Sequence, residues 1–203
     1  MTPEDVETFA SCVAAGGVAV FPTDTVYGLA CEPTATDAVR RLHALKRRRQ
    51  GKPAAVMFFD PELAQASLPD LGPRTRAALG ALLPGPVTVL VANPARRFPL
   101  ACGPEPMVLG IRVPQLGTGL ESLGDLRLPV LQTSANQAGA PDARRLEDVV
   151  AEIRAGADML LDGGELPGVA STVLDLRAYE GQGAWHIVRP GAVGTAAIQA
   201  ALG

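Results

Sequence analysis

Short apolar runs alternate along the chain with stretches in which apolar residues recur every three or four positions. The runs predict β-strands at residues 18–21, 54–59, 87–91, 109–114, 129–133, 159–161, 171–176 and 185–188. The amphipathic stretches predict helices at residues 3–15, 37–45, 61–68, 73–83 and 146–153, and after residue 191. Roughly seven strands and five or six helices indicate an α/β or α+β fold, in one domain covering residues 1–203.

Polar residues mark the expected helix starts. Thr2 is placed to cap the first helix, with Pro3 in its first turn and Asp5 completing a capping box. Thr36 is placed to cap the second helix. The proline-rich residues 93–106 predict an irregular loop.

A segment rich in hydroxyl groups follows the first strand. If residues 22–29 remain extended, the alternation of a strand puts Thr23, Thr25 and Tyr27 on one face. Such a row fits an exposed strand face, and it fits equally the wall of a polar pocket. The pattern alone does not separate the two interpretations.

The strand at 129–133 leads into Ser134 and Asn136, and Gly139 and Pro141 then break the strand. A hydroxyl and a carboxamide at the end of a rigid element are suited to hold a ligand. The alternative is that both side chains only stabilise a turn, through hydrogen bonds to nearby backbone.

Five cations occupy seven positions between Lys46 and Lys52, just before the apolar run at 54–59. A basic helix end exposed to solvent is the ordinary explanation, since cations favour a helix C-terminus. A run anchored beside a buried strand is also well placed to grip phosphate. Arg112 faces away from Ile111 and Val113 in its strand, and such an arginine is more often a surface residue than a ligand anchor.

Composition narrows the function classes. The 203 residues are 47% hydrophobic and carry a net charge of −3, with a pI near 5.4, so the chain as a whole does not resemble a non-specific nucleic-acid binder. Three scattered cysteines and two histidines show neither a CxxC nor an HExxH spacing, which argues against a disulfide framework and a metal site built from protein side chains. The sequence shows no signal-peptide pattern and no apolar run of about 18 residues, so a cytoplasmic protein without a membrane span is expected.

Familiar nucleotide motifs such as GxxxxGK[ST] and GxGxxG are also lacking. The sequence nevertheless resembles the YrdC/Sua5 (TsaC) family of threonylcarbamoyl-AMP synthases, through motifs that occur in the family's order along nearly the whole chain. These motifs are residues 21–29 (FPTDTVYGL), Lys46-x-Arg48 with Pro53, 84–88 (PGPVT), Arg112-x-Pro114, 134–141 (SANQAGAP), 171–173 (STV) and 189–191 (RPG).

The resemblance implies a twisted mixed sheet flanked by helices, with a concave basic groove. It also implies a nucleotidyltransferase reaction in which L-threonine, bicarbonate and ATP give L-threonylcarbamoyladenylate and diphosphate. This is the first step of N6-threonylcarbamoyladenosine formation in tRNA, which continues with partner proteins. Mg²⁺ is expected on the phosphates, not on protein side chains.

The resemblance further implies roles for ten residues. Lys46 and Arg48 are the expected catalytic cations, and Arg189 joins them on the phosphates. Arg112 suits the threonine carboxylate, and Thr25 and Ser171 suit its other polar groups. Ser134 and Asn136 are expected to bind the nucleotide. Tyr27 and Lys52 complete the expected set of binding residues.

Three positions depart from the family pattern: Arg49, Met57 and Ala170 stand where members often carry proline, histidine and glutamate. They put the detail of amino-acid binding in doubt. A rival function is a double-stranded RNA-binding module that uses the same groove. A rival enzyme is the related carbamoyl-transfer domain of hydrogenase maturation, which sits in longer chains with zinc-finger segments that this sequence lacks.

Overall fold

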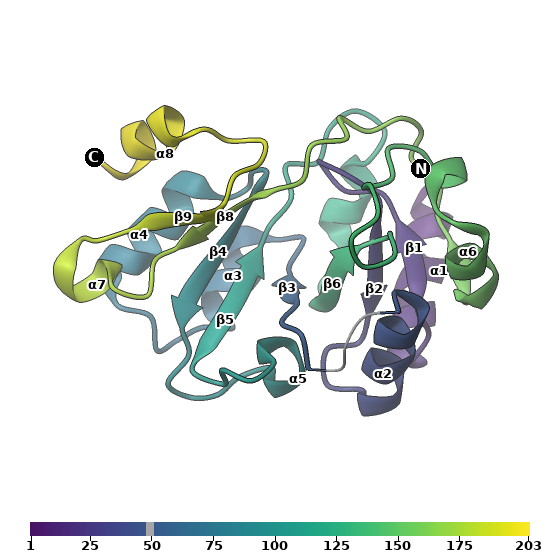
Figure 1. The fold of residues 1–203 in the computed structure, drawn as a ribbon, viewed down its shortest axis with the longest axis horizontal. Helices are drawn as coiled ribbons and strands as arrows, with labels where there is room; N and C mark the ends of the chain where they lie inside the picture. The colour runs from purple at the N-terminus through teal and green to yellow at the C-terminus, as the bar shows by residue number, and fades with distance from the viewer. Residues whose placement is uncertain (48–50) are drawn as a thin grey trace.

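A single mixed sheet runs through the computed structural model, which describes residues 1–47 and 51–203 (Figure 1). In these residues the sheet has nine strands in the order β7-β1-β2-β6-β3-β5-β4-β8-β9. The pairs β1–β7, β3–β5 and β4–β8 are parallel and the other five are antiparallel. The strands are β1 (Ala19–Phe21), β2 (Gly28–Cys31), β3 (Ala55–Met57), β4 (Val87–Ala92), β5 (Val108–Arg112), β6 (Val130–Ser134), β7 (Met159–Leu160), β8 (Thr172–Asp175) and β9 (His186–Arg189).

Helices cover the sheet unequally. In Figure 1, α2 and α6 lie on the near face beside β1 and β2, whereas α1, α3 and α4 lie behind the sheet. None of these five helices covers the near face of β3, β5 and β4, where only the short helix α5 lies, at the ends of β3 and β5, among the described residues. The helices are α1 (Pro3–Ala14), α2 (Thr36–Leu45), α3 (Pro61–Ala66), α4 (Pro73–Leu82), α5 (Pro99–Cys102), α6 (Ala151–Gly156), α7 (Tyr179–Gln182) and α8 (Thr195–Leu202), with 3₁₀ turns η1 (Glu121–Asp125) and η2 (Leu146–Asp148).

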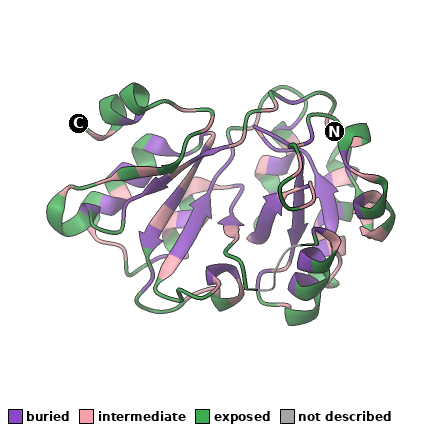
Figure 2. Cartoon of the chain, in the orientation of Figure 1, coloured by how far each residue is buried: buried purple, intermediate pink, exposed green. Residues whose placement is uncertain are grey.

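The core forms where the apolar stripes of the helices meet the apolar faces of the strands (Figure 2). Phe9 of α1 packs on Phe21 of β1, with ring centroids 5.3 Å apart, and Phe59 lies 6.2 Å from both rings. Along β4, Val87, Val89 and Val91 are buried, and the residues between them are more exposed. Burying large rings and branched side chains in this way supplies most of the driving force for folding.

Most predicted elements are confirmed, including the capping box of Thr2 and Asp5 on α1. The prediction that Thr36 caps α2 is wrong, because Thr36 is the first helical residue and Ala35 holds the cap position without a side-chain bond. The helical pattern at 146–153 is interrupted, giving η2 and then α6. The loop at 93–106 contains the short helix α5, and α7 was not predicted.

Residues 22–27 do not continue the first strand. β1 ends at Phe21 and β2 begins at Gly28, and the bend between them is held by the Thr23 hydroxyl, which donates to the Val26 carbonyl at 2.7 Å. Thr23, Thr25 and Tyr27 therefore do not share one face of a strand, because local side-chain bonds outweigh β propensity here.

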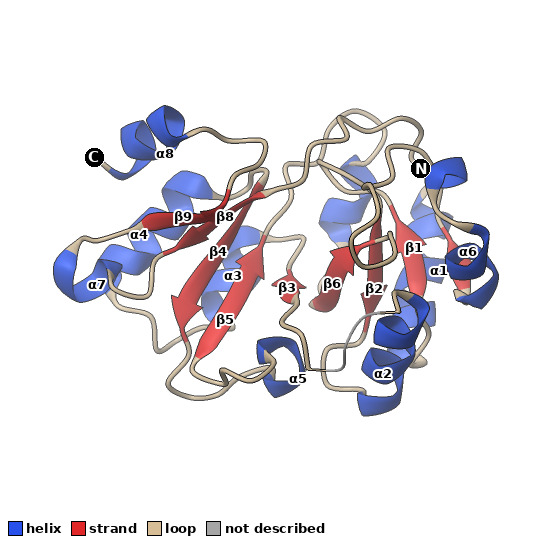
Figure 3. Cartoon of the chain, in the orientation of Figure 1, coloured by secondary structure: helices blue, strands red, loops and turns tan. Residues whose placement is uncertain are grey.

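The connection from β7 to β8 runs as a loop through residues 161–171 (Figure 3). It is long because β7 is one edge of the sheet and β8 is the second strand from the other edge. Among the helices in the described part of the chain, none is long and apolar enough to cross a membrane.

Candidate active site

A cavity of about 830 Å³ opens on the near face of the sheet, and Ala101 and Cys102 of α5 line part of it. Its size falls in the range usual for small-molecule sites. Side chains from β3, β4, β5, β6, β8 and β9 line it, together with residues 136–142 after β6. Ala55 and Gly110, which pair across β3 and β5, keep its floor low.

One end of the cavity is built around Lys46, the residue that ends α2. Lys46 is 3% exposed as a residue, and its ammonium donates to the Ser134 carbonyl and to the carbonyl and Oδ1 of Asn136, the latter two at 2.6 and 3.1 Å. Ser134 Oγ also donates to Asn136 Oδ1 at 2.6 Å, and Asn136 Nδ2 donates to the Ala140 carbonyl at 2.5 Å. The structure thus brings the predicted Lys46, Ser134 and Asn136 into one hydrogen-bonded cluster.

Arg112, at the end of β5, is buried and ion-paired. Its Nη2 lies 2.5 Å from Asp24 Oδ1 and 2.5 Å from Thr25 Oγ1, and both members of the ion pair are almost fully buried. Burial lowers the pKa of the Arg112 guanidinium, and Asp24 opposes that shift. The strand pattern alone favoured a surface position for Arg112, and the structure shows that it is buried instead.

Arg112 donates its hydrogen bonds to Thr23, Asp24 and Thr25 from Nη2, and in the described residues Nε has no partner. Since a guanidinium has five N–H groups, part of this one is left for a ligand. Arg112 lines the cavity, whereas Thr25 contributes by orienting Arg112.

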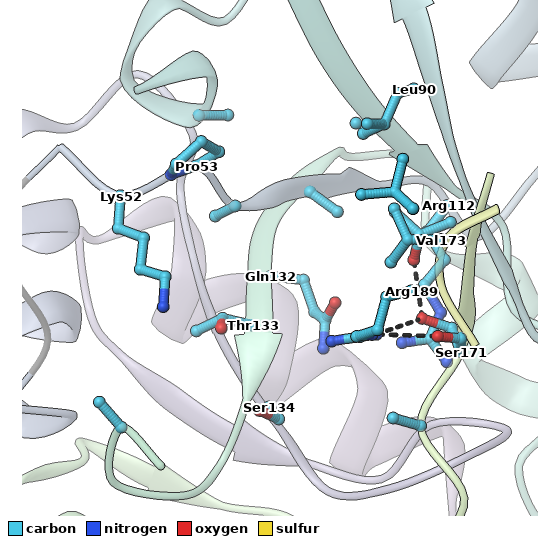
Figure 4. Close-up of a pocket in the computed structure, with 18 of the residues that line it drawn as sticks. Lys52, Pro53, Leu90, Arg112, Gln132, Thr133, Ser134, Ser171, Val173 and Arg189 are labelled. Carbon is cyan, nitrogen blue, oxygen red and sulfur yellow. Dashed lines mark hydrogen bonds between the residues drawn. The ribbon is translucent and has the colours of Figure 1, made fainter. Parts of the chain in front are cut away.

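Ser171, Thr88 and Arg189 form a third cluster, on the side of β4, β8 and β9. The hydroxyls of Ser171 and Thr88 are 2.8 Å apart, and Arg189 Nη2 donates to the Ser171 carbonyl at 2.8 Å (Figure 4). In the same view Lys52 and Arg189 extend into the cavity from different sides. The lining carries the cations Lys46, Lys52, Arg112, Arg177 and Arg189.

Of the predicted binding residues in the described part of the chain, Thr25 and Tyr27 do not line the cavity. Arg48 lies outside the described residues. The Tyr27 hydroxyl lies 2.8 Å from Asp162 Oδ1 and accepts the N–H of Gly163 at 3.0 Å, which ties the 161–171 loop to the start of β2. Thr25 assists, because its carbonyl accepts the N–H of Gly168 at 2.8 Å.

We expect Tyr27→Phe to lower the free energy of unfolding by about 1–2 kcal/mol, because the loop loses its buried hydroxyl partner while the ring stays packed. Denaturant unfolding measures the change. Tyr179→Phe is the matched control: its hydroxyl donates to the Leu202 carbonyl near the chain end, at 3.0 Å, and a smaller loss is expected. Equal losses for the two variants would show that Tyr27 does not anchor the loop.

Sequence reasoning missed several polar residues that line the cavity or, like Asp24, hold a residue that does. Asp24 and Thr88 lie inside the family motifs given above, and Gln132 is a polar residue within an apolar strand. These features are weak sequence signals for a place in the site. At the rim, Arg177 binds Asp175 through Nε and Nη2 at 2.8 and 2.6 Å. Burial alone would raise the pKa of Asp175, but the Arg177 bonds outweigh burial and hold that pKa below its ordinary value.

The described residues contain no group of three or more histidine, cysteine, aspartate or glutamate side chains arranged to hold a metal ion. Carboxylates do line the cavity, at Glu105, Asp142 and Asp175, but Asp175 is already engaged by Arg177. This donor set is suited to polar and anionic ligands and does not form a metal centre.

The fold and the cavity define an α/β protein with a polar, ligand-sized cavity on one face of a mixed sheet. A family model described as telomere recombination, that of the Sua5/YciO/YrdC proteins, matches residues 11–191. The chain belongs to this family.

Relatives agree in sequence and in fold. The threonylcarbamoyl-AMP synthase of Chromohalobacter salexigens is 36% identical over 182 residues, covering 87% of this chain and 97% of the relative. The human threonylcarbamoyl-AMP synthase is 31% identical over 191 residues, covering 87% of this chain and 63% of that protein. The crystal structure of P. abyssi Sua5 complexed with L-threonine has a TM-score of 0.84 at 24% identity, and it covers all of this chain and 58% of the Sua5 chain. At that identity the structural match establishes the fold alone.

Proposed function

We propose that this chain is a threonylcarbamoyl-AMP synthase. It converts L-threonine, bicarbonate and ATP to L-threonylcarbamoyladenylate, diphosphate and water, the first step of N6-threonylcarbamoyladenosine formation in tRNA. The observation that carries the proposal is the match to a synthase of nearly the same length, with 97% of that protein covered at 36% identity. The cavity supports it, since cations, hydroxyls and amides converge there from segments distant in sequence.

The three clusters divide the substrates between them. Lys46, Arg48, Lys52 and Arg189 are assigned to the phosphates, and Ser134 and Asn136 to the nucleotide. Arg112 takes the threonine carboxylate, with Ser171 beside it. Thr25 and Tyr27 act through Arg112 and the 161–171 loop respectively.

The chemistry requires positioning and charge stabilisation. The threonine amine adds to the bicarbonate carbon with loss of water, and an oxygen of the resulting carbamate attacks the α-phosphorus while diphosphate leaves. Negative charge increases on the phosphoryl oxygens and on the leaving group during this step. Cations held in fixed positions stabilise such charge, so the proposal needs no protein side chain as a general base.

A divalent cation fits the proposal as a phosphate-bound ion. Mg²⁺ usually binds through substrate phosphates and one or two carboxylates, and it would neutralise charge on the departing diphosphate. Three carboxylates line the cavity among the described residues. Asp175 is held by Arg177 through Nε and Nη2, whereas Glu105 and Asp142 are not held in this way. A cytoplasmic location, and transfer of the intermediate to tRNA by partner proteins, are parts of the same proposal.

The double-stranded RNA-binding alternative gains no support from the comparisons, because the relatives described above are named for synthase activity. The two functions differ in one measurement. A binding module retains RNA through salt-sensitive phosphate contacts and turns over no ATP.

The test is threonine-dependent release of diphosphate. Purified protein with ATP, bicarbonate and Mg²⁺ should release diphosphate when L-threonine is added and only at background level without it. An adenylate carrying the threonylcarbamoyl group should accumulate in step, as seen by mass spectrometry. Release that is independent of threonine, or no release at all, would refute the synthase assignment.

A further inference from the structure

Gln132 is a buried polar residue in the cavity floor, and none of the roles assigned above involves its side chain. It lies in β6, is 5% exposed and lines the cavity, where Figure 4 shows its carboxamide directed into the open space. In the described residues its carboxamide has no hydrogen-bond partner. The carboxamide faces the cavity and not a protein partner, so a ligand in the cavity can pair with both its N–H donors and its carbonyl.

The neighbouring positions leave this carboxamide room. In the sheet register, Gln132 stands opposite Ala30 of β2 and Ala55 of β3, and Gly110 follows Ala55 on β5. Gly28 lies under the side chain: a Cβ there would be 2.8 Å from Gln132 Nε2. Gln132 is therefore the only long side chain in the row formed by residues 30, 132, 55 and 110.

The position of Gln132 is intermediate between the two ends of the cavity. Ser134, in the Lys46 cluster, is on the same face two residues along β6, a distance of about 7 Å. Arg112 is two strands away across β3, about 10 Å in the hydrogen-bonding direction. If Lys46 marks the phosphates and Arg112 the threonine carboxylate, the reacting atoms meet between them.

The chemistry of a carboxamide matches the group that must lie there. Gln132 offers N–H donors and a carbonyl acceptor in one plane. The carbamate of threonine offers, also in one plane, anionic oxygens and one N–H. A pair of parallel hydrogen bonds joins the two groups and leaves the second carbamate oxygen free to attack phosphorus.

We propose that Gln132 binds the carbamate of threonine and aligns it for attack on the α-phosphate. The proposal rests on the synthase function above. The Gln132 amide N–H donates to the carbamate oxygen that does not attack, and its carbonyl accepts the carbamate N–H. The attacking oxygen forms the bond to phosphorus as the bond to diphosphate breaks, and Gln132 exchanges no proton.

The test compares Gln132→Leu and Gln132→Glu with wild type. The first keeps the side-chain size and removes both hydrogen bonds, and the second places an anion beside the carbamate. With ATP and threonine saturating, we expect kcat/KM for bicarbonate to fall about 10- to 100-fold in Gln132→Leu and further in Gln132→Glu. The KM for ATP should stay within about twofold of wild type, since lost contacts to one group change binding of that group. Gln199→Leu, the same change at an exposed position of α8, is the control and should match wild type.

A purely structural role for Gln132 predicts a different result in the absence of substrates. Because the carboxamide has no partner in the described residues, replacing it with leucine should leave the thermal midpoint of the ligand-free protein unchanged or higher. A lower midpoint for Gln132→Leu would overturn the proposal by revealing a structural contact.

The outcomes separate this proposal from the function on which it rests. Wild-type protein without threonine-dependent diphosphate release refutes the synthase assignment. An active wild type whose Gln132→Leu variant keeps its bicarbonate kcat/KM refutes only the carbamate site. An equal rise in the KM for ATP would also refute it, by placing Gln132 on the nucleotide.

Discussion

Replacing Lys46 with alanine is expected to lower threonine-dependent diphosphate release about 10- to 100-fold and the free energy of unfolding by about 1.5–3 kcal/mol. Lys46 is 3% exposed, and its ammonium joins the end of α2 to the Ser134 and Asn136 carbonyls after β6. Alanine leaves those acceptors without their charged partner, and it removes a cation from the expected phosphate site. Lys46→Ala is therefore expected to lower both the stability of the fold and the reaction rate. Replacing a residue that contacts only the substrate would lower the rate alone. Initial rates measured well below the melting temperature of the variant separate the two effects.

Arg47→Ala is the matched control, because Arg47 is adjacent in sequence but exposed and is not among the residues that line the cavity. We expect its rate to stay within about threefold of wild type, as for a screened surface charge. If Arg47→Ala lost as much activity as Lys46→Ala, the basic segment would act through its total charge. The defined Lys46 cluster would then have no special role.

Much of the sheet was predictable, because each strand carries its own signal. β4 alternates buried valines with Thr88 and Leu90, and this period fixes both the strand and the face that the cavity uses. The break at residues 22–27 was not predictable in the same way. The apolar and β-branched residues there favour a strand, but the Thr23 hydroxyl bonds to the backbone of Thr25 and Val26 and the chain bends. Side-chain bonds of this kind depend on conformation and leave little trace in composition.

The members of the site were largely predictable, whereas their pairing was not. The motifs supplied Lys46, Arg112, Ser134, Asn136 and Ser171. Nothing in the spacing indicated that Arg112 meets Asp24, since 88 positions separate them and the contact exists only after β5 lies in the sheet near the β1–β2 bend. Strand register likewise decides that Gln132 projects between small residues. Long-range pairing is a property of the assembled sheet, and a single sequence does not encode it locally.

The second large effect is expected at Asp24, the buried partner of Arg112. Asp24 Oδ1 lies 2.5 Å from Arg112 Nη2, with side-chain exposures of 5% and 4%, and Asp24 Oδ2 accepts the N–H of Gln115 at 3.0 Å. Asp24→Asn keeps the shape and removes the charge, which leaves a buried guanidinium without its counter-ion. Such a change costs about 3–5 kcal/mol of the free energy of unfolding, and we expect the lower end because asparagine still accepts hydrogen bonds. Urea unfolding monitored by tryptophan fluorescence gives the value.

Asp70→Asn makes the same substitution in an exposed ion pair. Asp70 and Arg97 are 3.1 Å apart with side-chain exposures of 42% and 38%, so a loss below about 1 kcal/mol is expected there. Equal losses at Asp24 and Asp70 would mean that burial adds nothing to the Asp24–Arg112 pair.

L-Threonine should then distinguish a structural ion pair from a binding site. If Arg112 holds the threonine carboxylate, that carboxylate restores a negative charge to the unpaired guanidinium of Asp24→Asn. A ligand that binds only the folded state stabilises it in proportion to its affinity. Saturating L-threonine should therefore raise the melting temperature of Asp24→Asn by more than it raises that of wild type, whereas L-threoninol, which lacks the carboxylate, should raise neither. If L-threonine raised the melting temperature of wild type more than that of Asp24→Asn, Arg112 would not bind the threonine carboxylate. The buried ion pair would then have a role in folding alone.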